Sequence, residues 1–144
     1  MSSLQFKRLN DGWNAEPNSP APAVEEVGSQ VQLTFFLKPS ERWGYDAEEG
    51  ELARLTFDEC ARWRLGETND EGWYLGQCRY SKIAPAWGEF YELSGLDSRR
   101  DDPTDWRFPT PSGSGERHFL FYLRDEMFEC LAAEWTFERR ITRV

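Results

Sequence analysis

The residues best suited to hold a ligand are arginines and tryptophans from the middle of the chain. They are Arg62, Arg64, Trp73, Arg79 and Trp87. A guanidinium group can hold a carboxylate or phosphate through two parallel hydrogen bonds, and an indole ring can stack on an aromatic or sugar ring. These five are therefore the predicted ligand-binding residues. As an alternative, Arg62 and Arg64 share one face of a predicted strand and form cross-strand ion pairs with Glu89 or Glu92.

Side chains for common catalytic mechanisms are scarce. His118 is the single histidine, and the chain has no motif that presents a nucleophilic serine. His118 is the first residue of a strand that is predicted to be buried, so we expect this histidine to be structural. A two-carboxylate hydrolase would use Glu89 or Glu134 and needs a second acid in reach. Glu89 and Glu92 are three positions apart on a strand and would face opposite sides. No catalytic residue is predicted, and an enzyme is the weakest functional alternative.

Metal binding is also not predicted. The cysteines lack the close pairing typical of zinc sites, and we expect them to be small core residues with free thiols. They are Cys60, Cys78 and Cys130. The four aspartates between positions 97 and 105 lack the glycine and spacing of a calcium-binding loop and favour a solvated loop. We therefore predict no metal and no cofactor.

The net charge of the chain limits the classes of molecule that it is expected to bind. The formal charge is −9, from 17 Lys and Arg against 26 Asp and Glu. Nucleic acids and anionic membranes bind through clustered cations, so both are disfavoured. A strongly acidic surface keeps a small protein soluble and speeds encounters with a basic protein. No apolar run reaches the roughly 18–20 residues of a membrane span, and residues 1–13 lack the apolar stretch of a signal peptide. We expect a cytoplasmic protein.

The aromatic content is high, with 7 Trp, 5 Tyr and 10 Phe, and alternating apolar segments predict strands. Residues 23–27 and 30–37 flank Gly28-Ser29, a pair that favours a tight hairpin turn. Residues 54–65 alternate over a length that predicts a bulge or bend near Asp58-Glu59. The sequence therefore predicts antiparallel neighbours in the first half of the chain.

Further strands are predicted in the second half. Residues 73–80 and 87–93 alternate, and residues 119–123 are apolar on both faces, as in a central strand that is covered on both sides. Residues 128–137 also alternate, although a helix fits part of the same stretch. The strand is favoured because the preceding turn is short and aromatic residues prefer strands.

Loops and an irregular arm complete the predicted organisation. Prolines and an Asn-Asp-Gly turn favour an irregular arm over about 1–22, which Trp13 attaches to the body of the protein. Loops are predicted over 38–50 and 96–115. Counting the segments gives an all-β single domain over 1–144, an antiparallel sandwich or barrel of about six to seven strands with long loops.

Three functions from different classes fit these observations. The first is a non-enzymatic module that binds another protein, because the chain is small, acidic and rich in the aromatic residues that dominate interfaces. The second is a β-protein that binds a sugar or an anionic aromatic compound in a pocket lined by Trp and Arg. The third is a carboxylate-dependent hydrolase.

Overall fold

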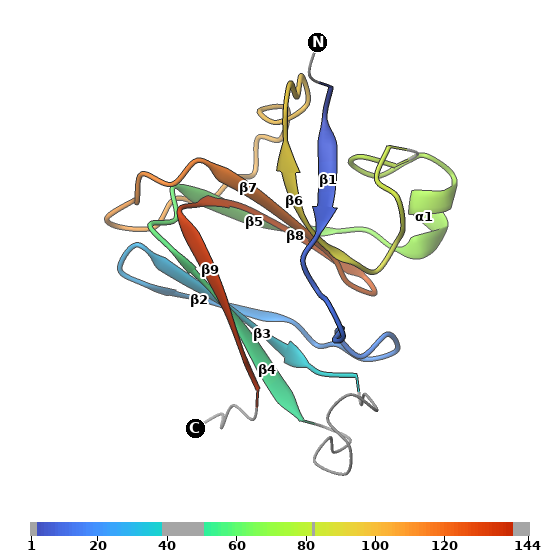
Figure 1. Ribbon diagram of the computed structural model, residues 1–144, viewed down its shortest axis with the longest axis horizontal. Coiled ribbons are helices and arrows are strands. Elements are labelled where there is room, and N and C mark those ends of the chain that lie inside the picture. The colour runs from blue at the N-terminus through green and yellow to red at the C-terminus, as the bar shows by residue number, and fades with distance from the viewer. Residues whose placement is uncertain (1–2, 39–50, 82, 140–144) are drawn as a thin grey trace.

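The computed structural model describes residues 3–38, 51–81 and 83–139. These residues form nine strands and one short helix, in two antiparallel sheets packed face to face (Figure 1). In the described part of the chain each sheet ends in two different edge strands, so the fold is a sandwich and not a closed barrel. The predicted all-β antiparallel fold is confirmed. The loop predicted over 38–50 lies outside the described residues except for Lys38.

The larger sheet has the strand order β1-β6-β7-β8-β5. These strands are β1 (Gln5–Arg8), β6 (Phe90–Ser94), β7 (Arg117–Tyr122), β8 (Glu126–Ala132) and β5 (Arg62–Glu67). Strand β7 is the middle strand, and its residues from 118 to 122 are all buried. Phe119 and Phe121 point toward the other sheet, whereas Leu120 and Tyr122 belong to a second core on the outer face. The prediction of a central strand covered on both sides is confirmed.

The smaller sheet has the order β2-β3-β4-β9. Its strands are β2 (Ala23–Val27), β3 (Gln30–Phe36), β4 (Leu52–Asp58) and β9 (Glu134–Arg139). The predicted hairpin is present, with Val27 paired to Gln30 and with Gly28 at a φ of 60° in the turn. Val31, Leu33 and Phe35 alternate with polar residues and are fully buried against the larger sheet.

The two longest predicted strands both divide where the chain crosses between sheets. The segment 54–65 bends at Glu59, whose φ is 52°, so β4 and β5 belong to different sheets. The segment 128–137 is extended, as favoured, but it breaks at Ala133 into β8 and β9. The amide of Ala133 donates to the carbonyl oxygen of Asp58 at 2.8 Å. The two crossings therefore lie side by side and hold the sheets together.

The prediction of a strand over 73–80 is wrong. Residues Asp70–Tyr74 form helix α1, and turns and bends follow as far as Ser81. The side chain of Asn69 accepts a hydrogen bond from the amide of Gly72 at 2.8 Å and caps the helix. Acidic residues in its first turn complement the positive end of the helix dipole. These capping signals outweigh the alternating pattern that favoured a strand. No helix in the described residues is long and apolar enough to cross a membrane.

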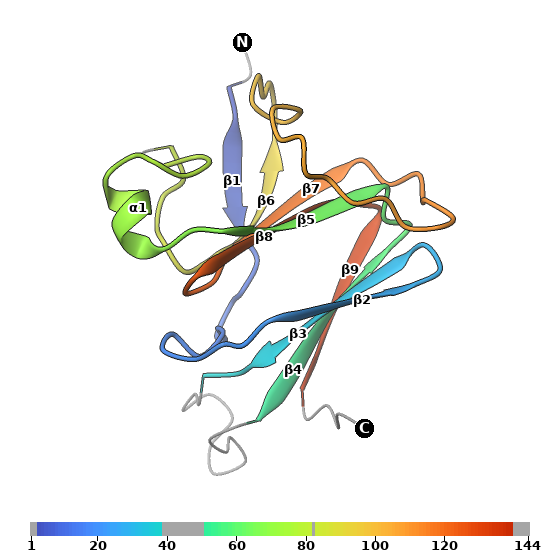
Figure 2. The same cartoon turned by 180° about the vertical axis from the view of Figure 1, so that it is seen from behind.

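The N-terminal arm is more regular than predicted. Within it, β1 forms an edge strand of the larger sheet by pairing with β6. Trp13 stacks on Phe137 with 4.2 Å between ring centroids, which confirms that this side chain attaches the arm to the body. Beyond Trp13 the arm crosses to the smaller sheet, where Ala15 pairs with Leu37. The arm thus spans one end of the sandwich (Figures 1 and 2).

Candidate functional site

A fully buried carboxylate lies on the outer face of the larger sheet. Glu129 of β8 has 0% of its surface exposed and accepts hydrogen bonds from Nε and Nη2 of Arg79 at 2.7 and 2.9 Å. Burial raises the pKa of Glu129, but the hydrogen bonds from His118 and Arg79 outweigh burial, and the net pKa lies below its ordinary value. Glu129 is therefore a buried anion that is stabilised by its partners.

His118 is enclosed by two acids. Its Nε2 lies 2.5 Å from Oε2 of Glu129, and its Nδ1 lies 3.8 Å from Oδ2 of Asp97. Asp97 also accepts a hydrogen bond from the hydroxyl of Tyr80 at 2.6 Å. Burial is the largest cause of a strongly raised pKa for Tyr80, which keeps the phenol protonated as a donor. His118 is only 5% exposed, and these contacts join the segments around Tyr80 and Asp97 to the outer face of the sheet.

The predicted binding residue Arg79 lies in the turns after α1, not on a strand. Every nitrogen of its guanidinium group already donates to the protein. Nε and Nη2 donate to Glu129, and Nη1 donates to the carbonyl of Arg99. Nη2 also contacts the carbonyl of Arg100 and the hydroxyl of Tyr80. Arg79 thus joins the loop before β7 to the buried carboxylate. A ligand would have to displace these contacts.

Arg62 and Arg64 pair with a different set of acids from the one predicted. Nε and Nη2 of Arg64 donate to the carboxylate of Asp105 at 2.9 and 3.2 Å. Arg62 bonds to Asp101, and its guanidinium lies over the ring of Trp106. Both acids belong to the irregular loop predicted over 96–115. The loop runs along the edge of β5, and the alternation pattern of the strands could not predict that path.

The predicted partners Glu89 and Glu92 have other contacts. Glu89 accepts a hydrogen bond from Asn10 at 2.6 Å, and Glu92 forms a two-bond pair with Arg117 at 2.9 Å. The other proposed catalytic acid, Glu134, is 3.6 Å from the Arg117 guanidinium. Glu134 is the register partner of Asp58 on β4 and shares the Arg117 guanidinium with Glu92, whereas Glu89 contacts Asn10 and Arg8.

The five predicted binding residues lie in three separate places. Arg64 and Arg79 line an open, polar hollow of about 660 Å³, whose walls also include Arg99, Asp102 and Asp105. Trp73 and Trp87 are not part of this lining. Arg62 lies apart from the hollow, in contact with Trp106. The arginines and tryptophans therefore do not form one pocket.

The two tryptophans instead form an aromatic ridge with two tyrosines. The ridge consists of Tyr74, Trp73, Trp87 and Tyr122, in that order. The distances between successive ring centroids are 5.1, 6.5 and 5.0 Å. Tyr74 is 68% exposed and Trp73 and Trp87 are half-buried. The ridge thus leads from solvent at the end of α1 to the buried end of β7.

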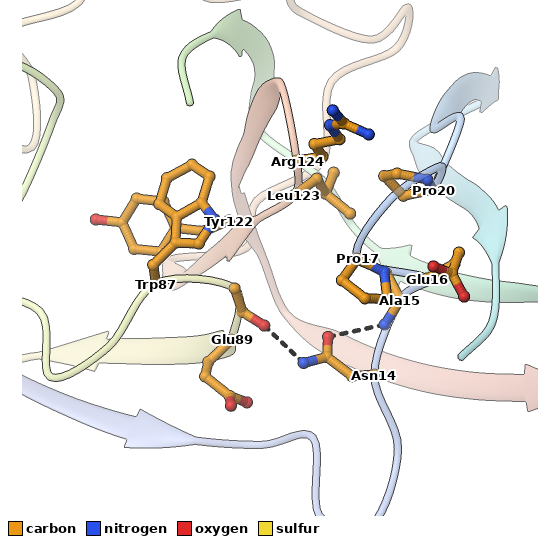
Figure 3. A pocket seen from close by; sticks show the side chains of 11 residues that line it. Asn14, Ala15, Glu16, Pro17, Pro20, Trp87, Glu89, Tyr122, Leu123 and Arg124 are labelled. Carbon is orange, nitrogen blue, oxygen red and sulfur yellow. Dashed lines mark hydrogen bonds between the residues drawn. The ribbon is translucent and has the colours of Figure 1, made fainter. Parts of the chain in front are cut away.

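A slot of about 200 Å³ lies at the buried end of this ridge. It is lined by 14–17 and Pro20 of the arm, by 87–89 ahead of β6, and by 122–124 at the end of β7. Figure 3 shows the rings of Trp87 and Tyr122 on one side and Pro17 and Pro20 on the opposite side. We call this space the slot. These four rings form its two facing walls, and the polar side chains of Asn14, Glu16, Glu89 and Arg124 also line it.

Hydrogen bonds keep the arm side of the slot in place. The side chain of Asn14 donates to the carbonyl of Gly88 at 2.7 Å (Figure 3). The carbonyl and amide of Phe36 bond to the amide of Glu16 and the carbonyl of Pro20, each at 2.8 Å. Because these bonds attach the arm to both sheets, the slot is formed before any partner arrives.

The polar side chains that line the slot already have hydrogen-bond partners. The carboxylate of Glu89 is directed away from the rings (Figure 3). It accepts a hydrogen bond from the side chain of Asn10. Arg124 donates to the carbonyl of Asn18, and Glu16 accepts from the amide of that residue. The indole nitrogen of Trp87 has no hydrogen-bond acceptor among the described residues. The slot therefore offers apolar surface and one donor.

Sequence reasoning found Trp87 but missed the arm and Tyr122. Asn14, Pro17 and Pro20 were assigned to an irregular lead-in, because a proline-rich segment gives no periodic signal. Asn14 acts through a contact 74 residues away along the chain, which no local pattern reveals.

The described residues contain no group of three or more His, Cys, Asp or Glu side chains that could hold a metal ion. Cys60 and Cys130 are buried and Cys78 is half-buried, all as free thiols. Comparisons with protein-family models, curated proteins and solved structures found no match.

Proposed function

We propose that this protein is a non-enzymatic module that binds another protein through the aromatic ridge and the slot. The observation that carries the proposal is the preformed slot between Trp87 and Tyr122 on one side and Pro17 and Pro20 on the other. Interfaces concentrate their binding energy in a few aromatic anchors that fill desolvated pockets. Since hydrogen bonds already hold the arm, little ordering cost opposes binding.

The size of the slot favours a side chain over a free ligand. Pockets for cofactors and drug-sized molecules have about 300–1,000 Å³, and the slot has about 200 Å³. It can take one side chain of a partner. The exposed Tyr74 and Leu75, at the other end of the ridge, extend the apolar surface that the rest of the partner would cover.

The charge of the chain indicates a basic partner. The formal charge is −9, and the exposed acids Asp70 and Glu71 lie in α1 beside the ridge. Such a field accelerates the approach of a positively charged protein and repels nucleic acid. We therefore propose a basic protein as the partner, and a cytoplasmic location remains part of the proposal.

A cross-linking experiment followed by binding to a purified partner tests the proposal. A photoreactive benzoylphenylalanine at the exposed position 74 should capture the partner, which mass spectrometry identifies. The purified partner should then bind Trp87→Ala about thirtyfold more weakly than the wild type, the effect of losing an anchor of roughly 2 kcal/mol. Trp106→Ala, which changes a tryptophan away from the ridge, is the matched control and should bind normally.

The variant Tyr74→Ala provides a second test in case Trp87→Ala does not fold. Tyr74 is 68% exposed, so its truncation leaves the core intact and should still weaken binding. If Tyr74→Ala and a folded Trp87→Ala both bind the purified partner as the wild type does, the ridge and slot are not the binding surface and the proposal is wrong.

The open hollow supports a second candidate, binding of a small anionic ligand. Its volume of about 660 Å³ lies within the range of ligand pockets, and Arg64 and Arg79 line it. It ranks second because Asp105 and Glu129 already occupy these guanidinium groups. Calorimetric titration with benzoate and with inorganic phosphate tests it: binding that Arg64→Gln abolishes would support this function, and no heat with either anion would exclude these ligands.

A further inference from the structure

We infer that the partner presents a proline-rich segment with basic residues to the ridge and slot. This inference rests on the proposed function and names the chemistry of the bound segment. It comes from three features of the surface: the hydrogen-bonding groups that it offers, the shape of its rings and the position of its acids.

The ridge offers donors to a segment that lacks them. The indole nitrogen of Trp87 and the hydroxyl of Tyr74 have no hydrogen-bond partner among the described residues. Proline has a carbonyl acceptor but no backbone N–H, so a proline-rich segment presents acceptors and leaves no donor unsatisfied against apolar rings. A strand or a loop would bring N–H groups against the rings of Trp87, Tyr122, Pro17 and Pro20, which offer them no acceptor.

The shape of the ridge suits an extended, rigid chain. The planes of Trp73 and Tyr74 lie at 87° and those of Trp73 and Trp87 at 56°, so successive rings form angled walls and not a flat sheet. A polyproline II helix projects its rings at regular intervals, and aromatic-lined grooves recognise it because it is already extended and loses little entropy on binding. The slot at the end of the ridge then holds one proline ring.

Acids lie at both ends of this path. Asp70 and Glu71 are exposed in the first turn of α1, next to Trp73 and Tyr74, and Glu16 lies on the arm side of the slot. The basic groups near the slot have acids beside them: Arg124 is 3.8 Å from Asp125, and Arg8 is 3.8 Å from Glu89. Arginine or lysine flanking the prolines would therefore meet opposite charge at either end.

Nuclear magnetic resonance of the full chain with a defined peptide tests the inference. The probe is a synthetic peptide of four Pro-Pro-Arg repeats. The indole N–H signals of the seven tryptophans report on separate places in one spectrum. The signals of Trp87 and Trp73 should shift on titration, whereas those of Trp63 in the main core and Trp106 beside Arg62 should stay in place.

Two matched peptides separate the contributions of proline and charge. Four Gly-Ser-Arg repeats keep the charge and four Pro-Pro-Glu repeats keep the prolines, and each should bind at least about tenfold more weakly than the probe. The variant Tyr74→Ala should also weaken binding of the probe. Equal affinity for Gly-Ser-Arg repeats, or shifts confined to tryptophans off the ridge, would overturn the inference.

Failure here is distinguishable from failure of the proposed function. If the cross-linked partner depends on Trp87 but the probe shifts no indole signal, the surface binds a protein through another kind of segment and only the inference is wrong. If neither the partner nor the probe depends on Trp87 and Tyr74, both are wrong.

Discussion

The carboxylate of Glu129 accepts two hydrogen bonds, at 2.7 and 2.9 Å, from the guanidinium group of Arg79, which lies 50 residues earlier in the chain. A second pair has nearly the same geometry: Glu92 accepts from Nε and Nη2 of Arg117, both at 2.9 Å. The two pairs differ in burial: the side chains of Glu129 and Arg79 are 0% and 10% exposed, and those of Glu92 and Arg117 are 21% and 40% exposed.

This contrast predicts unequal effects of the same substitution. Glu129→Gln leaves Arg79 as a buried charge without its partner and should lower the free energy of unfolding by about 3–5 kcal/mol. Glu92→Gln disrupts a partly exposed pair and should cost less, about 1 kcal/mol. Urea unfolding followed by circular dichroism measures both. Equal losses would mean that the covering segment does not exclude water from Glu129.

The same carboxyl predicts a pH dependence. The pKa of Glu129 lies below its ordinary value of 4.5, so the folded protein holds this proton less tightly than the unfolded chain. Its contribution to stability is then complete above pH 4.5 and is lost as the pH falls through the lower folded pKa. Unfolding by urea at a series of pH values should show a steeper acid loss for the wild type than for Glu129→Gln. Parallel curves would contradict the assignment.

Gly113 is predicted to be sensitive to the addition of one methyl group. A Cβ at this position would lie 2.1 Å from the carbonyl carbon of Glu59, in the crossing between β4 and β5. Because backbone and not a flexible side chain is in the way, Gly113→Ala should cost about 1–3 kcal/mol or more. Gly72→Ala is the control, since its nearest contact would be 3.4 Å away and alanine favours a helix. A stable Gly113→Ala would show that the loop can move away.

The three thiols should react in a set order. Burial is the main cause of the strongly raised pKa of Cys130, and Cys60 is equally enclosed, whereas Cys78 is half-buried beside Ser81. Since only the thiolate is reactive, native protein treated with iodoacetamide should be modified first at Cys78. Mass spectrometry of digested samples taken over time gives the order. Early modification of Cys60 or Cys130 would show that the core opens readily.

Prediction from the sequence succeeded where the signal is local. The hairpin at Gly28-Ser29, the buried strand β7 and the bend at Glu59 follow from residue types that are adjacent in the chain, because turn geometry and two-residue alternation are short-range properties. The same reasoning failed over 73–80, where the cap at Asn69 outweighed alternation. It also gave Arg62 and Arg64 the wrong partners, since their acids lie in a loop about forty residues away.

The amino-acid sequence alone determined that this is an acidic, aromatic-rich protein of antiparallel strands with a core on both sides of β7, because composition and periodicity decide which faces must be buried. Only the tertiary structure decided that the predicted arginines bond to the protein's own acids and that Trp87 meets Pro17 and Pro20 across a slot. These contacts join segments far apart in the chain, and their formation depends on how two sheets and an arm pack together, which no local pattern encodes.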